Sequence, residues 1–278
     1  MASQSRAAAR YHGDQAAVPG MLDFAVNVRA SEPPSWLVDR LAARMTDLGR
    51  YPSAVDERRA VHAVAARHGR RATSPTSVLH LRDQILALRR PGRIVVVDEA
   101  FADAIPGEPA SLAGESLPDV VVLRSLTMTW ALAGLRVGYA LGPRDVLDRM
   151  TARRPHWPLG TLQLEAIAAC SSPEAVSEAE RGAQRLATLR AAMVAGLTSI
   201  GLDVIDGCAP FVLFTVPDAQ LMRKHLDGKG VAVRRCDAFV GLDGEYLHAA
   251  VRPQWPVLVD AIAEFAAMSG LREEQVTP

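Results

Sequence analysis

Residues 125–138 read SLTMTWALAGLRVG, and this stretch decides the fold. It follows the apolar run Val120–Leu123, which is typical of a buried strand in a parallel sheet. Two hydroxyl groups come at the end of that strand, on Ser125 and Thr127, and Arg136 stands alone in what the pattern predicts as a third strand, residues 135–141. A lone arginine among apolar residues needs an anion or an acidic partner. Hydroxyls with a guanidinium indicate a phosphate site, and a salt-bridged arginine is the structural alternative.

A second motif, Asp98-Glu99-Ala100-Phe101, ends the apolar run of residues 93–98. The carboxyl end of a strand is where α/β sheets place their ligands. A buried carboxylate at that point can keep a heteroaromatic nitrogen protonated through a charge-assisted hydrogen bond. The structural alternative is an acid that caps the following turn.

The surrounding patterns predict two domains behind a flexible arm at residues 1–20. Residues 21–145 combine amphipathic helices with the three apolar strands, which predicts an α/β domain with a mostly parallel sheet. Residues 146–278 begin with a long helical stretch and then alternate short strands with helices. We therefore expect a smaller α+β domain at the C-terminal end.

The composition excludes several classes of partner. The chain has 278 residues with 31 basic and 31 acidic side chains, so no net charge favours nucleic acid or a membrane surface. No apolar run approaches the ~18 residues of a spanning helix, and the three cysteines form no metal-binding pair, so we expect a cytoplasmic protein without a metal. Only two lysines occur, Lys224 and Lys229, so chemistry that needs an amine has two candidates.

Taken together, the two motifs resemble the fold-type I aminotransferases (class I and II), which depend on pyridoxal phosphate (PLP). The family pattern S-x-[ST]-K-x-x-x-L-A-G-L-R-x-G matches residues 125–138 except at its lysine, and a D-E-A-[YF] segment precedes it, as here. The histidinol-phosphate aminotransferases and the threonine-phosphate decarboxylases of cobalamin synthesis are the most similar branches. Phe101 in place of tyrosine favours the decarboxylase-like branch weakly.

The resemblance implies a PLP site, an amino acid or amino-acid phosphate as substrate, and a homodimer. Asp98 would pair with the pyridine nitrogen, and Ser125, Thr127 and Arg136 would bind the phosphate. Tyr51 resembles the tyrosine that reaches the cofactor phosphate of a neighbouring subunit. The other positions that match family residues around the cofactor and substrate are Phe101, Ser74, Asn27, His248 and Arg252.

Four departures from the family pattern fall on this one site. Met128 replaces the lysine, and a thioether forms no imine and moves no proton. Ser74 replaces an asparagine that would bond the cofactor ring oxygen. His248 replaces the arginine that would clamp the substrate carboxylate, with Arg252 as a partial substitute. Between Ala72 and Thr73, a block of more than two βαβ units is missing, which corresponds to roughly 60 residues or more.

These departures predict a degenerate, inactive member of the family, a pseudoenzyme. Two other hypotheses stay open at this point: a PLP enzyme that works without an internal aldimine, and a dimerising or binding protein derived from the fold. A parallel sheet that lacks the missing strands is also expected to expose an apolar edge.

Overall fold

A computed structural model describes residues 16–69, 79–237, 239, 241–242 and 244–268. The chain forms two compact units, one of Met1–Asn27 with Arg185–Pro278 and one of Val28–Gln184. The division falls inside the long helix α7 (Pro173–Ser199), so it does not coincide with the boundary expected near residues 145–146. We call the two parts the terminal unit and the central unit.

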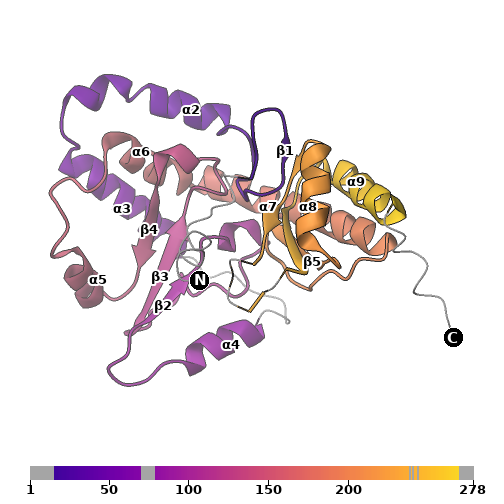
Figure 1. The fold of residues 1–278 in the computed structure, drawn as a ribbon. Coiled ribbons are helices and arrows are strands. Elements are labelled where there is room, and N and C mark those ends of the chain that lie inside the picture. The colour runs from indigo at the N-terminus through magenta and orange to yellow at the C-terminus, as the bar shows by residue number, and fades with distance from the viewer. Residues whose placement is uncertain (1–15, 70–78, 238, 240, 243, 269–278) are drawn as a thin grey trace, which may run out of the picture. The chain divides into compact units, whose positions relative to one another are not determined.

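The central unit contains a three-stranded sheet in the order β2 (Val95–Asp98), β3 (Val120–Ser125), β4 (Gly138–Leu141). As expected, β2 and β3 run parallel, whereas β4 is antiparallel to β3 (Figure 1). Helix α4 (Leu79–Ala87) covers one face, where Ile85 and Leu86 pack against the core side chains of β2 and β3. The sheet ends at β2 on one side and at β4 on the other.

The third strand is shorter than the sequence indicated. Residues Ala133–Leu135 form the 3-10 turn η4, and Arg136 follows in the left-handed region at φ 51°, so the strand begins only at Gly138. The prediction that Arg136 lies in an apolar strand is therefore wrong. Gly138 is required because a Cβ there would overlap the carbonyl oxygen of Arg124 on β3.

Helices α2 (Ser35–Ala42), α3 (Ala54–His68) and α6 (Thr161–Cys170) pack around a second core, together with the first part of α7. The central unit also contains η2 (Met45–Gly49), η3 (Ala102–Ala104) and α5 (Arg144–Thr151). Helix α3 begins where the Ser53 hydroxyl accepts a hydrogen bond from the backbone of Asp56, and basic residues occupy its last turn. Leu37, Trp130 and Ile167 are among the buried side chains that join α2 and α6 to the segment after β3.

Glu165 fixes α6 to its neighbours through charge. Its carboxylate is 3% exposed and bonds Arg40 of α2 at 2.9 Å, Arg44 at 3.1 Å, and Arg59 of α3. Arg44 also pairs with Asp56 at 2.9 Å. Several arginines around one buried carboxylate compensate its desolvation and lower its pKa.

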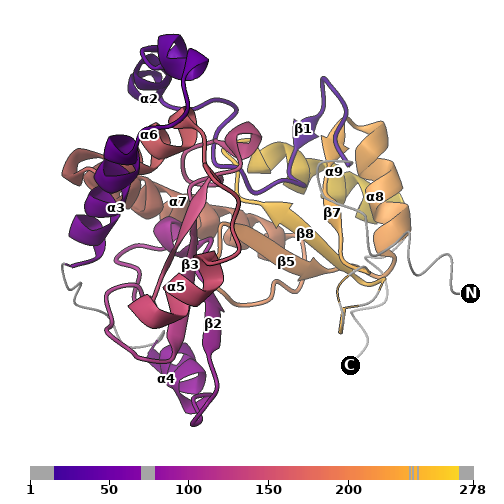
Figure 2. The ribbon, with the colours of Figure 1, turned by 90° about the vertical axis from the view of Figure 1, so that its left-hand side faces the viewer.

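The terminal unit is built on an antiparallel sheet in the order β5 (Phe211–Thr215), β8 (Tyr246–Ala250), β7 (Arg234–Arg235). A short parallel pair joins β1 (Leu22–Asp23) to β6 (Val231–Ala232). Helices α8 (Ala219–Gly228) and α9 (Trp255–Met268) lie on one side of the sheet (Figure 2), with Phe214, Leu247 and Ile262 in the shared core. This α+β arrangement agrees with the prediction for the C-terminal part. Within the described residues, no helix is long and apolar enough to cross a membrane.

Candidate functional site

Asp98 at the end of β2 is exposed and acts as a turn cap. Its Oδ1 accepts a hydrogen bond from the backbone N–H of Ala100 at 3.0 Å. The carboxylate lies on the same face of β2 as Ile94 and Val96, which are 39% and 58% exposed, because alternate strand residues share a face. A hydrated carboxylate in a turn is the alternative that the sequence left open. Phe101 is half-buried and directly precedes η3, where it is the N-cap residue.

The adjacent Glu99 is the buried acid. It lies on the face that α4 covers and is 8% exposed. Its carboxylate accepts hydrogen bonds from the Ser111 hydroxyl and the Leu112 backbone, both at 2.7 Å, and lies 3.2 Å from the guanidinium of Arg124. Sequence reasoning chose Asp98 of this pair and missed Glu99.

Glu99 belongs to a buried ionic network, which also contains Arg67, Asp103, Glu108 and Arg124. Arg124 is paired with all three carboxylates and Arg67 with two of them. The neighbouring carboxylates raise the pKa of both guanidinium groups despite their burial. The sequence signal was Arg124 itself, a charged residue near the end of an apolar strand.

His68 and Tyr139 lie at the edge of this network, and their side chains bond at 2.9 Å. Burial, with the positive charges of Arg124 and Arg67, lowers the pKa of His68 to about 3. Burial raises the pKa of Tyr139 to about 12. Both groups are therefore neutral at pH 7, and together they form a neutral border to the ionic network.

The expected phosphate-binding residues lie close together in the backbone ladder. Ser125 of β3 pairs with Gly138 of β4, and the N–H of Leu126 donates to the carbonyl of Val137 at 3.2 Å. Arg136 comes one residue before Val137, so its backbone lies beside the turn that begins at Ser125. The Ser125 hydroxyl accepts from the backbone N–H of Thr127 at 3.2 Å, and Thr127 is buried. Arg136 is exposed and its guanidinium donates to the carbonyl of Ala133 at 3.4 Å. Among the described residues no carboxylate pairs with it, so the salt-bridge alternative for Arg136 finds no support.

Met128 is half-buried, and its backbone carbonyl accepts a hydrogen bond from the N–H of Arg29 at 3.0 Å. Residues 28–184 contain no lysine. Of the two lysines of the chain, Lys224 lies in α8 and Lys229 ends that helix, where it pairs with Glu264 at 2.7 Å. The central unit therefore offers no amine of its own for an imine.

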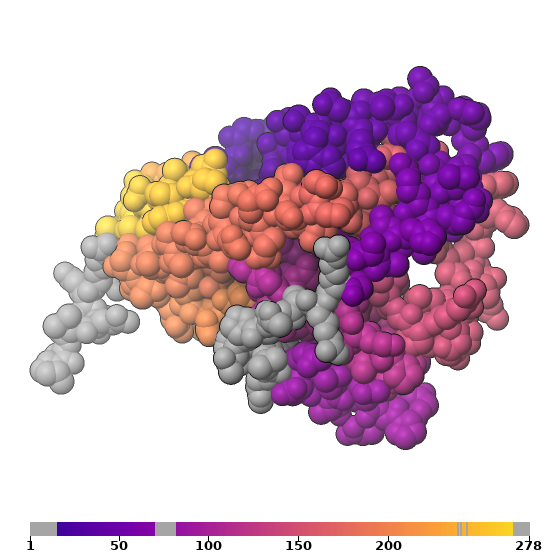
Figure 3. Space-filling model, turned by 180° about the vertical axis from the view of Figure 1, so that it is seen from behind, coloured from indigo at the N-terminus to yellow at the C-terminus, as the bar shows by residue number. Residues whose placement is uncertain are grey.

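Tyr51 is 75% exposed and stacks on Trp157, with ring centroids 4.1 Å apart and 17° between the planes. The space-filling view shows the segment between η2 and α3 next to the segment between α5 and α6, which carry these two rings (Figure 3). Ser74, the position of the family asparagine, lies outside the described residues.

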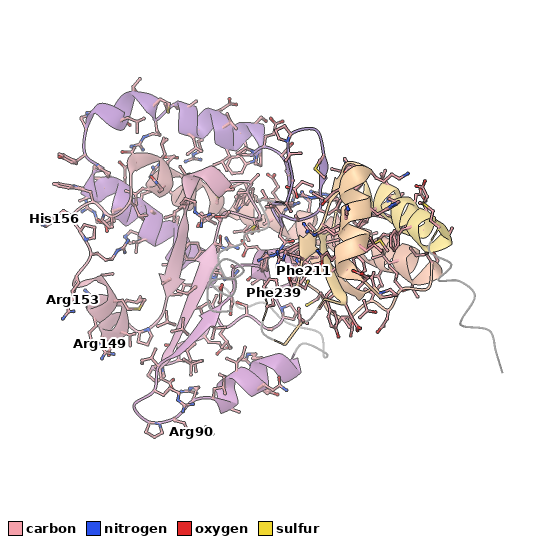
Figure 4. All side chains as sticks on the ribbon, viewed as in Figure 1. Arg90, Arg149, Arg153, His156, Phe211 and Phe239 are labelled. Atoms are coloured by element: carbon pink, nitrogen blue, oxygen red, sulfur yellow. The ribbon has the colours of Figure 1, made fainter. Side chains whose placement is uncertain are left out.

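In the terminal unit, Asn27 and His248, two of the positions that match family residues around the substrate, lie 3.4 Å apart between the amide nitrogen and Nε2. His248 is 6% exposed, and the ring of Phe211, labelled in Figure 4, lies 4.4 Å away between centroids. Burial and the charge of Arg234 lower the pKa of His248 to about 4, so the imidazole is neutral at pH 7. The Asn27 Oδ1 and His248 Nδ1 atoms are buried and have no hydrogen-bond partner in the part of the chain that the structure describes.

Arg252 is not positioned as a free carboxylate clamp. Its guanidinium donates to the backbone carbonyls of Val26 at 2.8 Å and Asp23 at 3.3 Å. These bonds fasten the first strand segment to the end of β8 in the same unit. The substitution of His248 by Arg252 that the sequence suggested therefore requires Arg252 to leave two structural hydrogen bonds.

The residues present do not fit PLP as a covalently held cofactor. The lysine is absent, Asp98 is hydrated and committed to Ala100, and His248 is a neutral imidazole where a carboxylate clamp is expected. What remains is a half-buried hydroxyl at Ser125 and the guanidinium of Arg136, which donates to the Ala133 carbonyl and has no carboxylate partner among the described residues. The described residues contain no group of three or more His, Cys, Asp or Glu side chains that could hold a metal ion.

Comparison with known proteins places these features in a family. The family model "Aminotransferase class I and II" matches residues 71–248. A histidinol-phosphate aminotransferase of Mycobacterium tuberculosis is 53% identical over 339 aligned positions, which cover 96% of this chain and 93% of that protein. The aligned part of this chain, 96% of its 278 residues, is shorter than the alignment of 339 positions. About 70 positions of the relative therefore have no counterpart here. A histidinol-phosphate aminotransferase of Pseudomonas aeruginosa is 34% identical and matches 58% of this chain and 47% of its own length.

Solved structures agree on the fold. The histidinol-phosphate aminotransferase of Clostridium acetobutylicum superposes with a TM-score of 0.76 at 16% identity and covers 89% of this chain and 100% of its own. The L-threonine-O-3-phosphate decarboxylase of Porphyromonas gingivalis gives a TM-score of 0.66 at 16% identity, with 88% and 99% coverage. The enzyme of Sinorhizobium meliloti, whose structure contains pyridoxal-5'-phosphate, gives 0.65 at 13% identity, with 86% and 89% coverage.

Proposed function

Because this chain belongs to the class I and II aminotransferase family, we propose that it is a homologue of the histidinol-phosphate aminotransferases that no longer holds PLP covalently and catalyses no transamination. The observation that carries the proposal is Met128 at the position of the family lysine, in a unit whose sequence has no other lysine. A thioether supplies neither the imine bond nor the proton transfer that the lysine performs in the family.

Two further features support the loss of activity. Asp98 is exposed, and an exposed carboxylate in water holds a cationic ring nitrogen far less tightly than a buried one. His248 is neutral at pH 7 because its pKa is about 4, so it neither attracts nor clamps a substrate carboxylate as an arginine does. An amino-acid phosphate is the substrate class that we infer for the ancestral enzyme, from the names of its relatives.

The missing chain supports the same proposal. About 70 positions of the mycobacterial relative have no counterpart, close to the two βαβ units expected to be absent between Ala72 and Thr73. The exposed side chains of Ile94, just before β2, and of Val96, within it, are what is expected of a sheet that lacks its neighbouring strands. We infer a shortened domain that keeps the end of the family sheet and lacks part of its middle.

The proposal is tested by adding PLP to the purified chain, reducing with borohydride and searching for a pyridoxyl-lysine adduct by mass spectrometry. We expect no stoichiometric adduct and no turnover of histidinol phosphate or threonine phosphate. A stoichiometric adduct at Lys224 or Lys229 together with turnover would overturn the proposal. The Met128→Lys variant is the matched control. We expect that it can form a pyridoxyl-lysine adduct at residue 128 but shows no turnover, because Asp98 is still exposed and His248 is still neutral.

A second candidate is PLP bound without a covalent link. It is favoured by the Arg136 guanidinium, which has no carboxylate partner among the described residues and stands beside the Ser125 turn. Spectral titration at high protein concentration tests it, with Arg136→Leu as the variant that should abolish any binding. Absence of a PLP spectrum in the wild-type protein eliminates this candidate.

A third candidate is a dimerising or binding protein derived from the fold. The exposed stack of Tyr51 on Trp157 favours it, because paired aromatic rings on a surface are typical of interface anchors. Chromatography with light scattering tests it: a defined dimer that the Tyr51→Ser substitution dissociates supports this candidate, and a polydisperse product contradicts it.

A further inference from the structure

Strand β2 has an open backbone edge. Val95 donates its N–H to Asp119 and Glu99 donates to Leu123, at 2.8 and 2.9 Å, both toward β3. In a parallel ladder, alternate residues bond the same neighbour, so residues 94, 96 and 98 direct their N–H and C=O groups away from β3. No strand in the part of the chain that the structure describes pairs with that side.

The side chains along this edge are apolar and exposed. Residues 94–97 read Ile-Val-Val-Val, with no charge to prevent pairing. Ile94 and Val96 share one face and are 39% and 58% exposed. Uncharged β-branched edges are the ones that accept a further strand, and natural proteins usually block them with lysine, proline or a bulge.

The ends of β2 carry opposite charges. Arg90 and Arg93 precede the strand and Asp98 ends it; Figure 4 shows Arg90 at the turn before β2. Both arginines donate to backbone carbonyls, Arg90 to Ala87 and Arg93 to Leu88, and neither has a carboxylate partner among the described residues. Asp98 accepts only from the Ala100 backbone within the same part of the chain. The edge is therefore basic at one end and acidic at the other, with neither charge neutralised.

We propose that β2 pairs with β2 of a second copy of this chain, antiparallel about a two-fold axis. Antiparallel pairing sets the basic end of each copy against the acidic end of the other, whereas parallel pairing would set like charges together. A two-fold axis perpendicular to the sheet keeps equivalent faces on one side. Ile94 of one copy then lies opposite Val96 of the other, twice, so each exposed apolar side chain covers its counterpart.

This pairing covers the open edge of β2 with a strand of the second copy, in place of the missing strands. It joins the three strands of each copy into one continuous sheet of two copies, and the backbone groups of residues 94 and 96 gain partners. It uses a different surface from Tyr51 and Trp157, so the two interfaces are separable by substitution. It also does not depend on whether PLP binds.

Sedimentation equilibrium of the full chain across the micromolar range tests the proposal. We expect a monomer–dimer equilibrium, and we expect Val96→Lys to raise its dissociation constant at least tenfold, because each copy then buries a lysine against the other. Val55→Lys is the matched control, since Val55 is 64% exposed and lies on helix α3, which is not part of the sheet that contains β2. Circular dichroism confirms that each variant is folded.

Val96→Pro provides a second variant that spares the folded chain. The N–H of Val96 points away from β3, so proline removes no bond of the internal ladder but removes a donor that the second copy needs. We expect it to weaken the dimer as Val96→Lys does.

Charge reversal tests the antiparallel arrangement. Asp98→Arg makes both ends basic, and the double variant Arg90→Glu, Arg93→Glu makes both ends acidic, so we expect each alone to remain monomeric. An equal mixture of the two should form a dimer again. The proposal is overturned by a monomer at all concentrations, by a dimer that Val96→Lys and Val96→Pro leave intact, by a dimer that Tyr51→Ser dissociates instead, or by polydisperse aggregation.

Discussion

Arg29 donates its backbone N–H to the carbonyl oxygen of Met128, at a distance of 3.0 Å. The same residue places its guanidinium against Gly182 of α7, where a Cβ would overlap it. Arg29 therefore links the segment that carries Met128 to a helix within the central unit. The backbone of Met128, the residue that we propose to stand in place of the family lysine, is therefore held by a hydrogen bond.

The contact of Arg29 with Gly182 predicts a change of sign in a double-mutant cycle. Gly182→Ala in the wild type should destabilise by up to about 1 kcal/mol, because the added methyl displaces the guanidinium, which is the movable end of a flexible side chain, and disturbs the contacts that it makes. In the Arg29→Ala background the same substitution should stabilise by up to about 1 kcal/mol, because alanine favours helix over glycine. Urea unfolding of the four proteins measures both values. Equal effects in the two backgrounds would show that the contact does not constrain Gly182.

The network of Arg124 predicts a large loss of stability. Arg124→Met should cost about 3 to 5 kcal/mol at pH 7, because it leaves Glu99 buried without a cation and Asp103 with Arg67 alone. Urea unfolding of the variant measures this cost. A cost below about 1 kcal/mol would mean that the network contributes no more than surface charge does.

Local patterns were enough to predict most elements of the fold. The apolar run of β3 depends on neighbouring residues alone, and the strand was found where it was expected. Arg136 was misplaced because η4 and the close approach of Gly138 to β3 depend on packing that periodicity does not record.

The environments of the candidate site residues could not be predicted from the sequence. Asp98 and Glu99 are adjacent, so they point to opposite faces of β2, and the sequence does not say which face is covered. Helix α4 covers the face of Glu99, and the face of Asp98 stays open. Likewise, the two backbone carbonyls that hold Arg252 are more than 200 residues away in the chain, so no local pattern revealed them.

The buried imidazole of His248 predicts acid sensitivity. Its pKa is about 4 in the folded protein and 6.5 in the reference state, so between these values the unfolded chain binds more protons. The contribution of His248 to the free energy of unfolding is therefore fully present above pH 6.5. It falls as the pH drops toward 4, by up to about 1.4 kcal/mol per pH unit. His248→Gln should remove this part of the slope. His62→Gln, at an exposed position of α3, is the matched control and should leave the slope unchanged.

The cluster around Glu165 predicts that a single carboxylate holds α6 in place. Glu165→Gln should destabilise by roughly 2 to 3 kcal/mol, less than for a fully buried pair because its arginine partners are partly hydrated. Asp148→Asn removes an exposed carboxylate that lies 3.7 Å from Arg144, and it should change stability by less than about 0.5 kcal/mol. Thermal unfolding of both variants decides the comparison. Equal effects would mean that the cluster around Glu165 behaves as ordinary surface charge.

Arg136 keeps a left-handed backbone at φ 51°, a conformation that glycine or asparagine adopts more easily than arginine. Its guanidinium gains little in return, since it bonds one carbonyl at 3.4 Å. Folding alone therefore gives no reason to keep an arginine there. If Arg136 no longer binds a phosphate, selection no longer keeps an arginine at this position. Substitutions there by residues that adopt the left-handed backbone more easily would then also stabilise the fold. Among orthologues that carry methionine at position 128, glycine or asparagine should accumulate at position 136 sooner than at the buried positions around it.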